Sequence, residues 1–424
     1  MAVRLEQMDS RKPKATVFYH YFPPDDVVSA VHFGELSAGL AQRGWDVTAY
    51  PTVWGCRDSS ARFPVIDKWC EVTIRRLWRP RLAQSSSVGR LVNAIWMITR
   101  WSLLALRRES SPSVLIVGTD PILSVLVARF WRFWRPKTRI AHWCFDLYPE
   151  AAIADGILTE NSAMARLFNQ ILGPAYRACS FVADIGPCMS MRLRRYPIVG
   201  RLETIVPWAL DEPEAPLGSA SAERQRIFGD ARLALLYSGN FGRAHSYAEI
   251  LDLAELLAPE NAHFAFSIRG NREAELKEVV EKRQLKVDFV PFAGASDLRA
   301  RLACADVHIV ALRPEWTGTV VPSKFFGALA AGRPVLFVGS TDSSVAQWIR
   351  EYEVGWVLNE RNISEVAGLL LRYAQSKDQQ LIMSQRCFAV YKRNFSREVQ
   401  IDRWNDILRS LVSQSDNAEV QVGD

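Results

Sequence analysis

Short apolar runs alternate along the chain with stretches in which apolar residues recur every three or four positions. Residues 14–21 fit a strand, residues 31–43 fit an amphipathic helix that Gly44 closes, and residues 46–50 fit a second strand. This order predicts a βαβ unit. Further short strands of the same half are expected at residues 114–117, 139–144, 181–185 and 204–206.

The alternation begins again in the second half, after a segment with no periodicity. Residues 211–221 read DEPEAPLGSAS, which is the composition of a linker. Beyond it we expect strands at residues 233–237, 264–269, 287–290, 307–311 and 334–338. The expected helices are residues 246–257, 273–283 and 296–304, a helix that starts at the PSK sequence, and a long last helix at 396–412.

The pattern predicts an α/β protein of two doubly wound, Rossmann-like domains. A chain of 424 residues suits two domains of about 150 to 200 residues each. We place the first domain at residues 1–208, the linker at 209–230 and the second domain at 231–390. Residues 391–424 are expected to form a C-terminal helix that packs back on the first domain.

Composition narrows the class of protein. Hydrophobic residues make up 49% of the chain and charged residues 23%, which indicates an ordered globular protein. The seven cysteines are scattered and never spaced as CxxC, so the sequence predicts neither a disulfide framework nor a zinc site. The N-terminal sequence MAVRLEQMDSRKPK lacks the apolar core of a secretory signal. We therefore expect a cytoplasmic protein.

Two loops in the second half combine small residues with a cation. Residues 233–243 read LALLYSGNFGR and residues 318–335 read GTVVPSKFFGALAAGRPV. Each places an apolar strand before a loop and a helix start, which is the arrangement that binds phosphate groups. A tight turn explains either loop alone, but together they favour a nucleotide-sugar site. Arg243 and Lys324 are its cations, and the expected donor-binding residues are Gly239, Asn240, Gly242, Gly270, Pro291, Gly318, Thr319 and Ser323.

In the first half, two aspartates follow predicted strands. Asp146 lies in the sequence FDLYPE, and Asp120 precedes Pro121. Either aspartate fits a helix N-cap, since Asp is among the best capping residues. We favour a catalytic role for Asp146, and for Asp120 a cap with an added contact to the acceptor. His142 lies within a strand pattern, and we expect it to be packed in the core.

The chain resembles the retaining glycosyltransferases of the family 4 class, which have the GT-B fold of two facing Rossmann-like domains. The resemblance spans almost the whole length and is carried by YFPPDD, DLYPE, YSGNFGR and PSKFFGALAAGRPV. It implies that the second domain binds the nucleotide diphosphate and that the first binds the acceptor. It also implies that Arg243 and Lys324 hold the pyrophosphate and that Asp146 lies beside the reacting sugar.

The sequence departs from that family pattern in two places. The family has two glutamates eight residues apart, and the matching positions here are Thr319 and Gly327. A carboxylate contact to ribose is therefore in doubt, and we expect the nearby Glu315 to be a solvated loop residue. The family's first loop carries paired glycines, where this chain has Pro23, Pro24, Asp25 and Asp26.

No carboxylate is marked as a nucleophile. The resemblance implies attack on the same face of the sugar, with the leaving phosphate accepting the proton of the acceptor. The protein then supplies orientation and charge stabilisation. We expect no metal, because cationic side chains already take the role that a metal would have at the diphosphate. We also expect no cofactor, since the nucleoside-diphosphate sugar, with UDP as the expected nucleotide, is a substrate.

Arginine and tryptophan are concentrated in the first half. Residues 72–108 contain eight arginines and no acid, and ARFWRFWRPK follows at residues 128–137. The apolar run at residues 91–106 is shorter than the roughly 20 residues of a membrane span. We expect a peripheral contact with the inner face of the cell membrane, or else core helices with snorkelling arginines. The expected membrane face includes Trp131, Arg132, Trp134 and Arg135.

These features together predict a hexosyltransferase that acts on a glycan acceptor, lipid-linked if the membrane contact is correct, in surface polysaccharide assembly. Nucleic acid is not expected as a partner, since no binding module accompanies the basic segments. Two alternatives stay open. One is a nucleotide-sugar epimerase of the same fold, and the other is a degenerate, membrane-bound partner of an active transferase.

Overall fold

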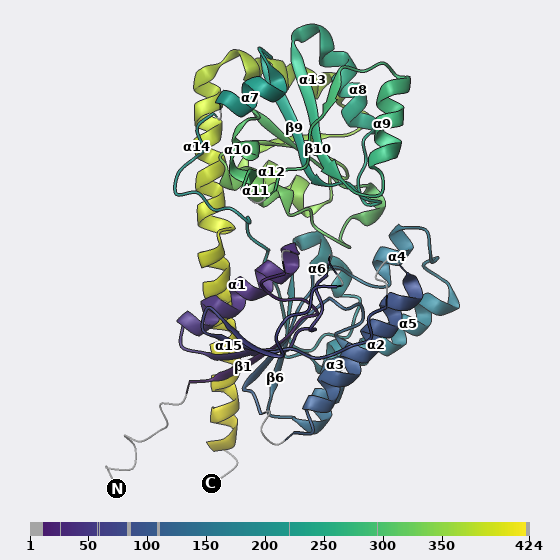
Figure 1. Ribbon diagram of the computed structural model, residues 1–424, viewed down its shortest axis with the longest axis vertical. Coiled ribbons are helices and arrows are strands. Elements are labelled where there is room, and N and C mark those ends of the chain that lie inside the picture. The colour runs from purple at the N-terminus through teal and green to yellow at the C-terminus, as the bar shows by residue number, and fades with distance from the viewer. Residues whose placement is uncertain are drawn as a thin grey trace.

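The computed structural model describes residues 12–25, 27–56, 58, 60–82, 86–107, 111–219, 221–294 and 296–420. Two α/β domains lie one above the other along the long axis of the molecule, and two C-terminal helices run beside them (Figure 1). Each domain contains one sheet of mainly parallel strands. The prediction of two doubly wound α/β domains is therefore confirmed.

The first domain is built on an eight-stranded sheet with the order β3-β4-β2-β1-β5-β6-β7-β8. All neighbouring strands are parallel except β3 and β4. The central strand β5 reads VLIVG and is buried throughout, as expected for a strand covered on both faces. The strands are β1 (Lys14–Phe18), β2 (Asp46–Ala49), β3 (Ile66–Trp69), β4 (Val72–Arg75), β5 (Val114–Gly118), β6 (Arg139–Trp143), β7 (Phe181–Asp184) and β8 (Arg201–Thr204).

Among the residues that the structure describes, six helices belong to this domain. Local capping fixes two of their starts, because the hydroxyls of Ser86 and Ser162 accept hydrogen bonds from backbone N–H groups of the first turn. The helices are α1 (Val28–Gln42), α2 (Ser87–Leu104), α3 (Leu126–Trp134), α4 (Glu150–Ala154), α5 (Ala163–Ala178) and α6 (Pro187–Leu193).

The second domain contains a six-stranded parallel sheet with the order β11-β10-β9-β12-β13-β14. Its strands are β9 (Leu233–Asn240), β10 (Ala262–Arg269), β11 (Val287–Phe289), β12 (Val307–Ala311), β13 (Val335–Val338) and β14 (Gly355–Leu358). The helices are α7 (Ser221–Phe228), α8 (Ala248–Leu257), α9 (Glu273–Lys282), α10 (Leu298–Ala303), α11 (Lys324–Ala330), α12 (Ser344–Tyr352) and α13 (Ile363–Gln375), with 3-10 turns η1 (Ala258–Glu260) and η2 (Pro314–Trp316).

The last two helices join the domains. Helix α14 (Lys377–Asn394) lies beside the second domain, and α15 (Arg397–Val420) continues down beside the first (Figure 1). Trp404 of α15 is fully buried, with ring centroids 5.5 Å from Trp143 and 5.2 Å from Phe181. At the surface, Arg43, the residue that follows α1, forms ion pairs with Glu398 and Asp402 of α15. The end of the chain thus completes the core of the first domain.

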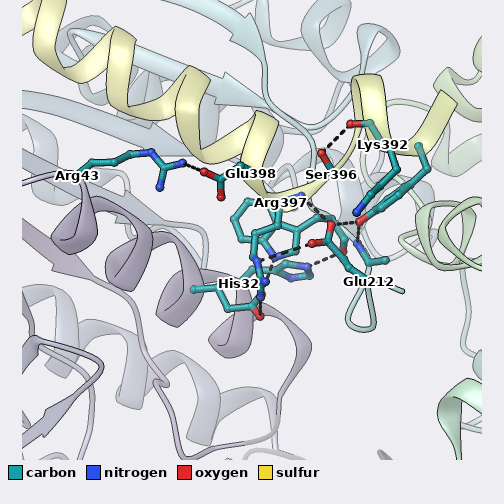
Figure 2. Close-up of polar contacts among 11 residues, drawn as sticks. His32, Arg43, Glu212, Lys392, Ser396, Arg397 and Glu398 are labelled. Carbon is teal, nitrogen blue, oxygen red and sulfur yellow. Dashed lines mark hydrogen bonds and ion pairs between the residues drawn. The ribbon is translucent and has the colours of Figure 1, made fainter. Parts of the chain in front are cut away.

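A polar network holds the linker where the domains meet (Figure 2). His32 Nε2 lies 2.9 Å from the carbonyl oxygen of Trp208, and Arg397 donates to Glu35 at 2.8 Å. The hydroxyl of Tyr391 donates to Glu212 and accepts the Ala209 N–H at 3.0 Å. These contacts tie the linker both to α1 and to the junction of α14 and α15.

Some elements differ from the sequence prediction. The strand expected at residues 204–206 is β8 at Arg201–Thr204, because its pairing with β7 starts at Arg201. The β3–β4 hairpin and the edge strand β14 were not predicted. Both lie at sheet edges, where half-exposed residues leave only a weak hydrophobic pattern.

The predicted membrane face is wrong for Trp131. This side chain is 1% exposed, and its indole N–H donates to the Trp101 carbonyl at 3.0 Å. Arg132 donates to the Ala178 carbonyl at 3.0 Å, and Arg135 donates to the Ala105 carbonyl at 2.8 Å. These two guanidinium groups join neighbouring elements within the domain.

Trp134 is 50% exposed and is the one member of that predicted set with a largely accessible side chain. The outer side of α2 is apolar instead, with Val88, Leu91, Val92, Ile95 and Leu103 exposed. Among the residues that the structure describes, no helix combines the length and the apolar character needed to cross a membrane.

Candidate active site

The candidate site lies between the domains, at the carboxyl ends of β9 and β10. A cavity of about 230 Å³ is enclosed there by residues of the second domain, by the linker and by α1. Four of the predicted donor-site residues line it: Gly239, Asn240, Ser323 and Lys324. The cavity therefore unites the two loops that the sequence singles out.

Lys324 opens α11 and is held against the loop that follows β9. Its ammonium donates to the Asn240 carbonyl at 2.9 Å and lies 5.0 Å from the centre of the Tyr237 ring. Burial lowers the pKa of Lys324 to about 8, because loss of solvent disfavours the charged form of the amine. An anion that entered the cavity would supply the missing counter-charge.

Gly239 makes room for this lysine. Its φ of +129° is rarely adopted by residues with a side chain, and a Cβ atom there would lie 2.5 Å from Lys324 Cε. The glycine is thus needed both for the turn of the backbone and for the path of the lysine side chain.

Arg243 lies outside the cavity wall and reaches across to the first domain. Its guanidinium donates to the carboxylate of Asp155, the residue that follows α4. The Arg243 side chain is 58% exposed, whereas that of Asp155 is 12% exposed. The predicted pyrophosphate ligand is therefore engaged by a carboxylate of the opposite domain.

The loop between Arg243 and α8 folds back on itself through His245. The Gly242 N–H lies 3.0 Å from His245 Nδ1, and the ring stacks on Phe241. Burial, followed by the charge of Lys324, lowers the pKa of His245 to about 3, so the imidazole is neutral. Sequence reasoning missed this residue.

Gly270 and Pro291 support the site from behind the cavity wall. Gly270 has a φ of +147°, and its Cα faces the carbonyl oxygen of Phe241 too closely for a side chain. The Pro291 carbonyl accepts hydrogen bonds from Ser267 and from Arg301 at 3.0 and 2.9 Å.

Part of the cavity lining is apolar. Phe292 lies under the guanidinium of Arg269, 4.1 Å from ring centre to Cζ, and Leu298, Leu302 and Ile309 also line the cavity. The lining thus combines the cations Lys324 and Arg269 with apolar and aromatic side chains.

Thr319 and Gly318 do not contact the cavity, contrary to the prediction. The Thr319 side chain is fully buried, and its hydroxyl donates to the Trp316 carbonyl at 2.7 Å. A Cβ atom at Gly318 would lie 2.6 Å from the Cys188 carbonyl oxygen of the first domain. Both residues fix the contact between the domains.

Of the two positions where the family has a glutamate, Thr319 is buried away from the cavity and Gly327 lies at it. Gly327 lines the cavity, and a Cβ atom there would meet nothing within 4 Å. Glu315 lies in the turn η2, with its side chain 55% exposed and 3.5 Å from Arg313, as expected for a solvated residue. Asp26, which belongs to the first-loop departure, lies outside the described residues.

Asp146 and Asp120 lie together at the carboxyl ends of β6 and β5. Burial, with a smaller contribution from the charge of Asp120, raises the pKa of Asp146 to about 6. Neither aspartate caps a helix, since α3 begins at Leu126 and α4 at Glu150. The Leu147 N–H donates to the Thr319 carbonyl at 3.1 Å, which brings this loop against the second domain.

Two buried histidines of the first domain each have a hydrogen-bond partner. His20 Nδ1 lies 3.2 Å from the carboxylate of Asp120, and sequence reasoning missed this pair. His142 is buried with Nδ1 2.9 Å from the Val117 carbonyl, as predicted for a packed residue.

Comparison with known proteins identifies the class. Residues 232–376, which hold β9 to α13, match the family described as glycosyl transferases group 1. The chain is a glycosyltransferase with the GT-B fold. The expected fold and the resemblance to glycosyltransferases are confirmed.

This glycosyltransferase is 23% identical over 344 residues to the probable glycosyltransferase WbjE of Pseudomonas aeruginosa, covering 79% of the chain and 84% of the relative. Its fold is similar to that of WaaG, a glycosyltransferase involved in lipopolysaccharide biosynthesis (TM-score 0.64, 16% identity, 93% and 99% coverage). It is also similar to that of Anabaena HepE in complex with UDP and glucose (TM-score 0.63, 13% identity, 94% and 100% coverage).

Proposed function

We propose that this glycosyltransferase moves a hexose-type sugar from a UDP-sugar to a glycan acceptor, with retention, in surface polysaccharide assembly. The observation that carries the proposal is a single cavity that both Lys324 and Phe292 line. A diphosphate requires fixed cations and N–H donors, whereas a nucleobase requires a flat apolar surface. One cavity offers both.

The proposed chemistry relies on charge stabilisation of the leaving group. As the glycosidic bond breaks, negative charge grows on the diphosphate, and a cation held in a dry site lowers that barrier. Among the residues described at the cavity wall, Asp211 is the one carboxylate, and it is paired with Arg299 at 2.5 Å. This arrangement favours same-face attack over an enzyme nucleophile.

The acceptor is expected at Asp120 and Asp146. A carboxylate with a pKa of about 6 is mainly ionised at neutral pH and can accept a hydrogen bond from a sugar hydroxyl. Both aspartates belong to the first domain, whose helix α1 lines the cavity, although neither lines the cavity itself. We propose that they orient the acceptor, while the leaving phosphate receives its proton.

The polysaccharide context and the choice of UDP draw support from the relatives. WaaG is a glycosyltransferase involved in lipopolysaccharide biosynthesis, and HepE forms a complex with UDP and glucose. The apolar α2 surface supports a lipid-linked acceptor, because exposed Leu and Ile beside arginines favour a membrane interface.

The donor proposal is tested by incubating the purified protein with UDP-, GDP- and dTDP-sugars and measuring free nucleotide. A transferase releases nucleotide slowly from its donor, and an epimerase instead yields an isomeric nucleotide sugar. Lys324→Ala should lower kcat/KM, and the decrease should correspond to a loss of about 2 to 4 kcal/mol of transition-state stabilisation. Neither product from any donor would contradict the proposal and favour a degenerate partner.

The same assay tests the proposed independence from metals. Because Lys324 supplies the charge that a metal would otherwise supply, excess EDTA should leave nucleotide release unchanged. Loss of activity with EDTA, restored by added Mg²⁺ or Mn²⁺, would show that a metal is required.

A further inference from the structure

Helix α2 is apolar both on the side that faces the core and on its outer side. On the core side, Met97 and Trp101 are fully buried. On the outer side, apolar residues with exposed fractions between 37% and 70% recur at helical spacing. These residues are Val88, Leu91, Val92, Ile95, Trp96 and Leu103. Because a helix that is apolar all round is normally covered on every side, the outer side of α2 indicates a partner.

Two polar side chains on the outer side of α2 have internal hydrogen bonds. The Thr99 hydroxyl donates to the Ile95 carbonyl at 2.7 Å, and the Trp96 indole N–H donates to the Trp78 carbonyl at 2.8 Å. Both donors can therefore leave water at little cost. Trp78 is 50% exposed, and its ring centre lies 5.3 Å from that of Trp96. Such exposed tryptophans are typical of the boundary between a bilayer and water.

The surroundings of this side are basic. Arg90, Arg100 and Arg107 are exposed, and the sequence contains no acidic residue between positions 72 and 108. A second copy of the chain that docked through the same surface would bring arginines against arginines. A bilayer that contains anionic lipids instead offers phosphates to the arginines and acyl chains to the apolar residues.

The start of α2 lies beside the loop that carries Asp146. Burial, with the charges of Asp146 and Asp120, raises the pKa of Tyr148 to about 12, and the charge of Arg90 opposes this rise. Such an effect requires Arg90 to lie close to Tyr148. The outer side of α2 thus begins near the two aspartates proposed to orient the acceptor. It lies on the side of the first domain away from α15 (Figure 1).

We propose that the outer side of α2 docks the protein on a bilayer that contains anionic lipids, with the start of the helix bringing the Asp146 loop to the membrane surface. A lipid-linked glycan then reaches Asp120 and Asp146 while its lipid stays in the bilayer. The inference deepens the proposed use of a lipid-linked acceptor, but it rests on the surface of the first domain and not on the donor cavity.

The experiment is flotation of the full chain with vesicles of phosphatidylcholine, either alone or mixed with phosphatidylglycerol. We expect the unchanged protein to float with the mixed vesicles, to be released from them at high salt, and to float poorly with phosphatidylcholine alone. The double variant Leu91→Glu with Ile95→Glu should bind the mixed vesicles at least about tenfold more weakly, because carboxylates do not enter an apolar layer. Arg100→Gln should weaken this binding about fivefold.

The matched control is Leu381→Glu with Ile382→Glu. These two apolar side chains are similarly exposed, but they lie on α14, beside the second domain. This variant should float as the unchanged protein does. Circular dichroism of each variant checks that the fold is retained.

Equal flotation of the α2 double variant and the unchanged protein would overturn the proposal, and so would the absence of flotation with the mixed vesicles. In that second case, sedimentation would show whether the α2 substitutions dissociate a dimer, which would assign the surface to a second copy of the chain. Flotation uses no nucleotide, so a protein that floats but releases nucleotide from no donor would contradict the proposed function alone.

Discussion

At the scale of single residues, the protonation of Lys324 decides whether the cavity is cationic. A pKa near 8 means that the amine is mainly charged at neutral pH and loses its charge as the pH rises through that value. Because free-enzyme groups govern kcat/KM, this parameter should fall on the alkaline side of about pH 8.

The measurement is kcat/KM for nucleotide release as a function of pH. In Lys324→Arg the guanidinium stays charged across the range, so the alkaline fall should disappear even if the maximum is lower. An identical alkaline fall in both proteins would assign it to another group.

Gly239→Ala tests the path of that side chain. The added methyl group occupies the place of Lys324 Cε and the backbone φ becomes strained, so activity should fall about as far as in Lys324→Ala. Gly218→Ala is the control, since a Cβ there meets nothing within 4 Å and should leave nucleotide release unchanged.

At the scale of elements, Arg243 in the loop after β9 is held by Asp155 at the end of α4, which would compete with a donor pyrophosphate for it. The guanidinium is bound to Asp155 and must turn from it to reach a pyrophosphate. An ion pair with a largely exposed guanidinium contributes up to about 1 kcal/mol. Its loss should therefore favour the donor slightly.

Asp155→Asn is expected to tighten UDP binding by about two- to fivefold in calorimetry, because the competing carboxylate is removed. Asp342→Asn, which changes an exposed acid on another loop, should have no effect. Weaker binding in Asp155→Asn would mean that the pair orients Arg243 for the donor.

Some strands and loops could be predicted from the sequence, whereas the contacts of particular side chains could not. Strands with continuous apolar runs, such as β5 and β12, could be placed within a residue or two, and the glycine-rich loops predicted Lys324 at the donor cavity. The contacts of His245 could not be predicted, since they depend on a loop that folds back onto Gly242. Trp131 was misassigned because a short basic aromatic helix has the same composition whether its tryptophan is buried or exposed.

At the scale of the whole molecule, α15 forms part of the first domain's core. Trp404 packs on Trp143 and Phe181, which belong to two neighbouring strands. Removal of a fully buried tryptophan costs about 3 to 5 kcal/mol. We expect Trp404→Ala to lower the denaturant midpoint strongly, whereas Trp134→Ala, at an exposed position, should change the free energy of unfolding by less than about 0.5 kcal/mol.

The position of α15 also bears on how the protein is made. The ribosome synthesises the strands of the first domain long before it translates Trp404. The apolar surface that α15 covers in the folded protein therefore stays exposed on the nascent domain while the second domain is synthesised. Chains that stop before residue 397 should therefore be poorly soluble, and the first domain expressed alone should need the last helix supplied as a separate peptide.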